Sequence, residues 1–94
     1  MTELAHLNNH HRDTVAKILR HPTSHNVEWK AVLSLLRDIG QVDERHDGRF
    51  AVTVGGEMEI FDRPKRKDID EQQVVDLRRM LTAAGYAVDG RRED

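Results

Sequence analysis

Two pairs of turn-forming residues, Asp47-Gly48 and Gly55-Gly56, divide the segment 41–62 into three pieces of similar length. Both pairs readily take the positive backbone angles that tight hairpins need. The piece between them alternates apolar and polar or small side chains with the period of a half-buried strand: Phe50, Val52 and Val54 against Arg49, Ala51 and Thr53. The segment therefore predicts a three-stranded antiparallel meander on which the rest of the chain packs.

The first hairpin can be given a register. A two-residue loop at Asp47-Gly48 would pair Val52 with Asp43 and put Val42 on the opposite face. A three-residue loop, 46–48, with Gly48 in the left-handed region pairs Val42 with Val52 instead. Because a slip of one residue moves every side chain to the other face, the apolar pattern favours the longer loop.

The second hairpin is less determined by the sequence. The same argument at Gly55-Gly56 would pair Val52 with Ile60, but it requires an awkward conformation at Glu57, so this register stays open. We expect Ile60 to face the helices together with the apolar residues of the first two strands. The opposite face is then expected to carry Ala51, Thr53 and Phe61, with Arg49 as a further candidate, and an exposed Phe there would indicate an interface.

Helices are predicted on both sides of the meander. Apolar residues recur at helical spacing over residues 4–20, and Asn8-Asn9 could cap a shorter helix that ends before His21-Pro22. A second helix is expected from a cap at Asn26 to Ile39, with Gly40 ending it in the left-handed region.

The third helix is expected to begin at Asp70, which forms a capping box with Gln73, and to end at Gly85. Its apolar stripe is predicted to contain Val74, Leu77, Leu81 and Ala84, widened by Val75 and Met80.

The predicted order is α-α-β-β-β-α, an α+β fold with the helices on one face of the sheet. A chain of 94 residues has room for one domain, here 1–88, made of an extra N-terminal helix over 1–22 and a core over 26–88. The charged segment 89–94 is predicted to be a disordered tail.

Composition limits the function. The net charge of -2 argues against a strong non-specific nucleic-acid binder, although a local basic patch could still act. The absence of Cys fits a reducing cytoplasm, and no apolar run approaches the length of a membrane span or a signal peptide. We expect a cytoplasmic protein with no membrane partner.

Three segments resemble parts of a known family: LLRDIG at 35–40, RHDGRF at 45–50 and LRRMLTAAGY at 77–86. From Val27 to about Val88 the chain is similar to HicA, the toxin family of bacterial toxin–antitoxin pairs. The resemblance implies a fold like the double-stranded-RNA-binding domain, cleavage of messenger RNA without a metal or other cofactor, and silencing by a HicB-like antitoxin protein.

One position departs from the family pattern. The toxins carry Gly-Ser-His at the start of the second strand, where the His serves the chemistry, but this chain has Gly48-Arg49-Phe50. His46, two residues before the Gly, is then the candidate for general acid–base catalysis, with Arg45 or Arg49 steadying the phosphate. The alternative is a solvated His in a turn.

The strongest charge run follows the meander: Arg63, Lys65, Arg66 and Lys67 lie within five residues. Such a run could bind an RNA backbone without reading its sequence, or it could be a solvated loop. Arg78 and Arg79 could extend the patch from the third helix.

Other chemistry is weakly supported. His6 and His10 have a spacing that could hold zinc, but no further ligands complete a site, so no metal is predicted. Gly55-Gly56 lacks the following Lys of a phosphate-binding loop, and no Ser/His/Asp arrangement stands out.

Two hypotheses follow. The first is an RNA-binding domain of HicA-like fold, with His46 as the catalytic residue if it is an endoribonuclease. The alternative is a non-catalytic module that binds a protein partner or a second copy of itself through the open sheet face and the N-terminal helix.

Overall fold

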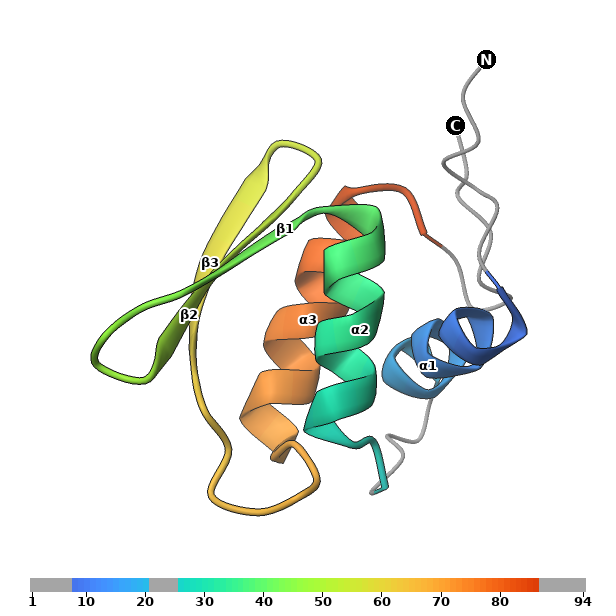
Figure 1. Cartoon of the computed structure of the whole chain (residues 1–94). Helices are drawn as coiled ribbons and strands as arrows, with labels where there is room; N and C mark the ends of the chain where they lie inside the picture. Colours follow the sequence, from blue (N-terminus) through green and yellow to red (C-terminus); the bar gives the residue numbers. More distant parts are fainter. Residues whose placement is uncertain (1–7, 21–25, 87–94) are drawn as a thin grey trace.

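The computed structural model describes residues 8–20 and 26–86, and it has the predicted α+β topology. The sheet forms one layer, α2 and α3 lie side by side against it, and α1 packs on the side of these helices away from the sheet (Figure 1). The elements are α1 (Asn9–Leu19), α2 (Trp29–Ile39), β1 (Gln41–Glu44), β2 (Arg49–Val54), β3 (Glu57–Asp62) and α3 (Glu71–Ala83).

The first hairpin has the register that the apolar pattern favours. Val42 lies opposite Val52, and the loop is 46–48 with Gly48 at a φ of 84°. The Arg45 N–H donates to the Arg49 carbonyl at 2.8 Å, and the Gly48 N–H donates to the Arg45 carbonyl at 3.1 Å. The prediction of a three-residue loop is confirmed.

The second hairpin has a two-residue turn. Val54 lies opposite Glu57, so Val52 faces Glu59 rather than Ile60. Gly55 has a φ of 60° while Gly56 has no positive φ, the pattern of a type II′ turn. This turn needs no unusual conformation at Glu57, which explains why it is adopted.

The shorter turn reverses the expected faces of β3. Ile60 is 42% exposed and Met58 58% exposed, so the prediction that Ile60 faces the helices is wrong. Phe61, expected on the open face, is only 3% exposed and lies opposite Phe50 under the helices. A single-residue shift in register moves both side chains to the other face, which accounts for both errors.

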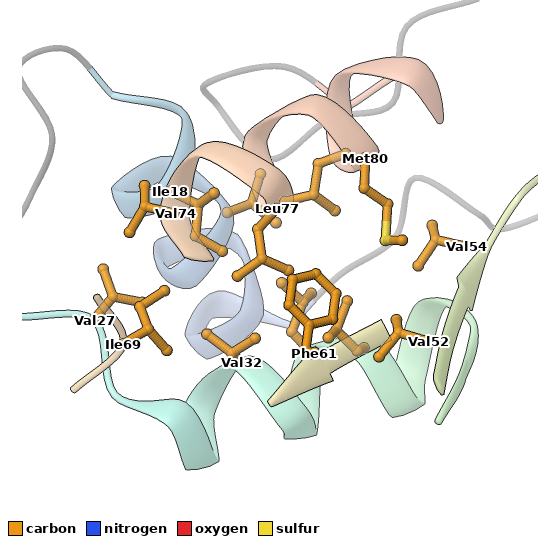
Figure 2. Close-up of a cluster of buried hydrophobic side chains, with 14 of the residues drawn as sticks. Ile18, Val27, Val32, Val52, Val54, Phe61, Ile69, Val74, Leu77 and Met80 are labelled. Atoms are coloured by element: carbon orange, nitrogen blue, oxygen red, sulfur yellow. The ribbon is translucent and has the colours of Figure 1, made fainter. Parts of the chain in front are cut away.

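The core fills the space between the sheet and the helices and continues beneath α1 (Figure 2). Phe50 is 1% exposed, and its ring meets Trp29 edge-on at 5.3 Å between centroids. Phe61 also approaches Trp29, at 6.4 Å. Aromatic contacts thereby hold the start of α2 against the end of the sheet where β2 begins and β3 ends.

Helix α1 is the shorter version that an Asn8 cap predicts. The Asn8 side chain accepts a hydrogen bond from the His11 N–H at 2.7 Å. Val15 and Ile18 are fully buried against the other helices. The Arg78 guanidinium donates to the carbonyl of Ile18 at 3.2 Å and so caps the end of α1.

Both expected ends of α2 need correction. The cap residue is Glu28 rather than Asn26, and it makes no side-chain capping bond; the Trp29 N–H instead donates to the Lys67 carbonyl at 2.9 Å. Gly40 is extended, with a φ of -160°, rather than left-handed. A Cβ atom at Gly40 would lie 2.1 Å from the Thr53 carbonyl oxygen, so a glycine is needed there for the close approach to β2.

Helix α3 begins with the predicted capping box. The Gln73 N–H donates to Asp70 at 2.8 Å, and the Asp70 N–H donates to the Gln73 side chain at 3.0 Å. Gly85 follows the helix with a φ of 96°, as predicted. Met80 is buried, but Val75 is 42% exposed and does not widen the apolar stripe.

No helix in the described part of the chain has both the length and the apolarity needed to cross a membrane. The predictions for the first half of the N-terminal helix, for the stop at His21-Pro22 and for the tail at 89–94 lie outside the described residues.

Candidate nucleic-acid interface

The two basic segments predicted from the sequence leave the sheet at the same end. Arg49, the first residue of β2, lies opposite Asp62, the last residue of β3. The hairpin loop 46–48 precedes Arg49, and the basic loop, residues 63–67, follows Asp62 (Figure 1). Antiparallel pairing of β2 and β3 therefore brings both groups of cations to one end of the sheet.

The basic loop is held at both of its ends. At the start, the Gln73 side chain donates to the Asp62 carbonyl at 2.8 Å. At the far end, a short antiparallel bridge pairs Glu28 with Asp68, and the Ile69 N–H donates to the Val27 carbonyl at 2.9 Å. The arc between these anchors is short and positioned by both α2 and α3.

Three of the predicted cations have carboxylate partners. Arg63 bonds Glu44 at 2.9 Å, and its guanidinium also lies 5.4 Å from the centre of the Phe50 ring. Arg49 pairs with Asp62 at 3.2 Å. The Lys67 ammonium lies 3.7 Å from the Glu28 carboxylate, the longest of the three contacts. The positive charge of these residues is thus partly balanced.

Three other predicted cations are unbalanced. Arg45, Lys65 and Arg66 are exposed, and none of them forms an ion pair with any residue in 8–20 or 26–86. Lys65 and Arg66 line a hollow of 640 Å³ formed by residues 62–70 and Gln73. Of the six predicted binding residues, Arg45, Lys65 and Arg66 are those without a carboxylate partner among the described residues.

His46 lies in the exposed hairpin turn beside Arg45, as predicted. Its imidazole makes no hydrogen bond to another side chain in the described part of the chain. The other described histidines, His10 and His11, lie on α1, on the opposite side of the helix layer (Figure 1). Within the described residues, no second histidine joins His46 at this end of the sheet.

The third helix does not extend the basic patch. Arg78 donates to the carbonyls of Ile18 and Arg20, and it therefore stabilises the C-terminal end of α1. Arg79 bonds Glu59 at 3.0 Å and Asp76 at 3.3 Å. The hydrogen bond that Arg79 donates to Glu59, followed by the negative charge of Glu59, raises the pKa of Arg79 above its ordinary value. Both guanidinium groups have structural partners that the sequence did not reveal.

Among the described residues, this surface has no exposed Trp, Tyr or Phe side chain on which a base could stack. The four aromatic residues of the chain are all buried in the core, with Trp29 the most exposed at 8%; the others are Phe50, Phe61 and Tyr86. A nucleic acid bound here would be held through its phosphates rather than through stacked bases.

A polar cluster on the other side of the molecule escaped the sequence analysis. His11 is only 6% exposed; its Nδ1 lies 3.1 Å from Asp38 and its Nε2 3.1 Å from the Ser34 hydroxyl. The available signal was the position of His11 four and seven residues before Val15 and Ile18, which places it on the apolar face of α1. Nothing in the sequence pointed to its partners on α2.

Within the same described ranges, no three His, Asp or Glu side chains are placed to share a metal ion. His6, half of the pair with zinc-like spacing, lies outside these ranges. No family model, curated protein or solved structure matched the chain in the three comparisons.

Proposed function

We propose that the protein binds the backbone of RNA with the basic loop and the neighbouring hairpin. The observation that carries this proposal is the placement of Arg45, Lys65 and Arg66, which are exposed, without ion pairs among the described residues, and brought to one end of the sheet by the pairing of Arg49 with Asp62. Anchors at both ends of the loop support a pre-formed phosphate site.

Binding through phosphates has recognisable properties. The affinity should vary little with base sequence and should fall steeply as the salt concentration rises, because bound cations release counterions from the RNA. The burial of all four aromatic side chains supports this mode over base stacking. The net charge of -2 predicts that binding is local and modest in strength.

The resemblance to HicA supports a more specific version of the proposal. The helix, three-stranded meander and helix from Trp29 onward have the order that this family implies. In this version the RNA is cytoplasmic messenger RNA and a HicB-like antitoxin is the protein partner. Cleavage would be metal-independent, with His46 as the general acid or base.

The test compares two variants of equal charge change. Lys65→Gln/Arg66→Gln removes the unpaired cations of the basic loop, while Arg12→Gln/Arg37→Gln removes exposed cations from α1 and α2. At a fixed low salt concentration, we expect the first variant to bind RNA about tenfold more weakly or worse, and the second to match the wild type. Equal losses in both variants would show that only total charge matters and would reject the loop as the site.

A second candidate function rests on the open sheet face. Met58 and Ile60 of β3 are 58% and 42% exposed. Met58 is paired with Thr53 of β2, and Ile60 is paired with Ala51 of β2. This apolar strip could dock a second copy or a HicB-like protein. If the wild type self-associates through it, Met58→Ser/Ile60→Ser should be monomeric in light scattering; an unchanged mass distribution would exclude this face.

A further inference from the structure

The polar cluster of His11, Ser34 and Asp38, between α1 and α2, is not part of the proposed RNA-binding surface. Ser34 and Asp38, one turn apart on α2, flank the His11 ring from α1. The ring nitrogens lie 3.1 Å from the Ser34 hydroxyl and 3.1 Å from the Asp38 carboxylate. We propose that these three residues form an acyl-transfer site in which Ser34 is a nucleophile toward small activated esters.

The partners of the ring determine where its proton lies. A carboxylate can only accept a hydrogen bond, so the Asp38 contact places the proton of the neutral imidazole on Nδ1. The lone pair of Nε2 then faces the hydroxyl of Ser34. A nucleophile, a base and a group that orients the base thus follow one another at hydrogen-bond distance.

The fold holds the base in this position. The His11 N–H donates to the Asn8 cap, and the ring is buried, with His11 only 6% exposed. Burial between two helices limits the rotation of the ring, whereas Ser34 itself is exposed to solvent. A reagent can therefore reach the hydroxyl while the base behind it stays in place.

A hollow beside Ser34 suggests the class of substrate. It has a volume of 320 Å³, lies between α1 and α2, and includes Lys30, one turn before Ser34. Lys30 has no ion pair within 8–20 or 26–86. Since the backbone N–H groups around Ser34 are used within α2, the Lys30 ammonium is the donor for the negative charge that develops on the substrate oxygen. The small volume favours a compact acyl group.

The reaction balances with these groups. The Ser34 oxygen attacks the ester carbonyl as its proton moves to Nε2 of His11. The bond to the leaving alcohol breaks, and the alcohol takes that proton, which leaves an acyl ester on Ser34. Water then attacks the acyl group, again giving a proton to Nε2, and the proton returns to Ser34 as the carboxylic acid departs.

The test uses the full chain and the probe diisopropyl fluorophosphate. Peptide mapping by mass spectrometry should place one diisopropylphosphoryl group on Ser34, with loss of fluoride, and none in Ser34→Ala. Ser24→Ala, which changes the only other serine of the chain, should react like the wild type. Failure to modify Ser34, while a known serine esterase run alongside is labelled, would overturn the proposal.

Asp38 is a positioning residue, and its role is tested by the rate at which Ser34 is labelled in Asp38 variants. Asp38→Asn should slow labelling at least about tenfold, because the amide no longer favours the proton on Nδ1. Asp38→Glu should restore part of the rate, and thermal unfolding of both variants establishes that they are folded. Equal labelling rates in the wild type and Asp38→Asn would show that the His11 contacts only join α1 to α2.

Discussion

Replacing Gly40 with Ala tests the packing of α2 against the sheet. The added Cβ would lie 2.1 Å from the Thr53 oxygen and 3.1 Å from a methyl group of Val54. Since Cβ atoms essentially never approach another heavy atom within 3.0 Å, the backbones must separate by about 0.9 Å. Thr53 lies in the central strand and is paired with Gln41 and Met58, so it cannot move alone.

The expected cost follows from two opposing effects. Overpacking of this kind costs about 1–3 kcal/mol. The Ala variant has a lower conformational entropy in its unfolded state, which stabilises the folded state by about 0.4–1 kcal/mol. We therefore expect Gly40→Ala to lower the free energy of unfolding by about 1–2 kcal/mol, or Tm by about 4–8 °C for each kcal/mol in a domain of this size.

The measurement is urea unfolding followed by circular dichroism, with Gly56→Ala as the matched control. A Cβ at Gly56 would meet nothing within 4 Å, and Gly56 has no positive φ. This control should be as stable as the wild type or slightly more so. If Gly40→Ala also unfolds at the wild-type urea concentration, the close approach to Thr53 does not exist in solution.

Three other changes test the core, a cap and the proposed chemistry. Phe50→Ala removes a ring that is 1% exposed and should cost about 3–5 kcal/mol in urea unfolding; a loss below 1 kcal/mol would contradict its burial. Asp70→Ala opens the capping box with Gln73 and should cost about 0.5–2 kcal/mol, whereas an unchanged midpoint would mean that the box contributes nothing. His46→Ala should keep the wild-type Tm and RNA affinity and abolish any RNA cleavage that the wild type shows in the presence of a chelator; full cleavage by this variant would remove His46 from the mechanism.

The sequence predicted the parts of the fold that depend on local rules. Gly48 and Gly85 need positive φ, and Asp70 with Gln73 forms a capping box, so each could be placed from neighbouring residues alone. The register of the first hairpin followed because Val42 and Val52 must share a face.

The errors arose where a distant segment decided the outcome. The role of Gly40 depends on Thr53 in another strand, and the start of α2 depends on the Lys67 carbonyl rather than on a side-chain cap. At the second hairpin, both turns satisfied part of the apolar pattern, and the burial of Phe61 beside Trp29 accompanies the shorter one. Neighbouring residues contain no information about such contacts.

In the candidate site, too, the features set by neighbouring residues were predicted and those set by distant segments were not. The basic loop and His46 were visible as a charge run and a turn residue. The neutralisation of Arg49 and Arg63 by carboxylates, and the partners of His11, required the tertiary structure. The charge run alone therefore overstated how many cations are available to a phosphate.

The salt dependence of RNA binding tests the central claim most directly. For single-stranded RNA, each phosphate contact contributes about 0.7 to the slope of log affinity against log salt. If Lys65 and Arg66 each hold a phosphate, their replacement by Gln should reduce this slope by about 1.4, while Arg12→Gln/Arg37→Gln should leave it unchanged. The same slope for the wild type and Lys65→Gln/Arg66→Gln would contradict RNA-backbone binding by the basic loop.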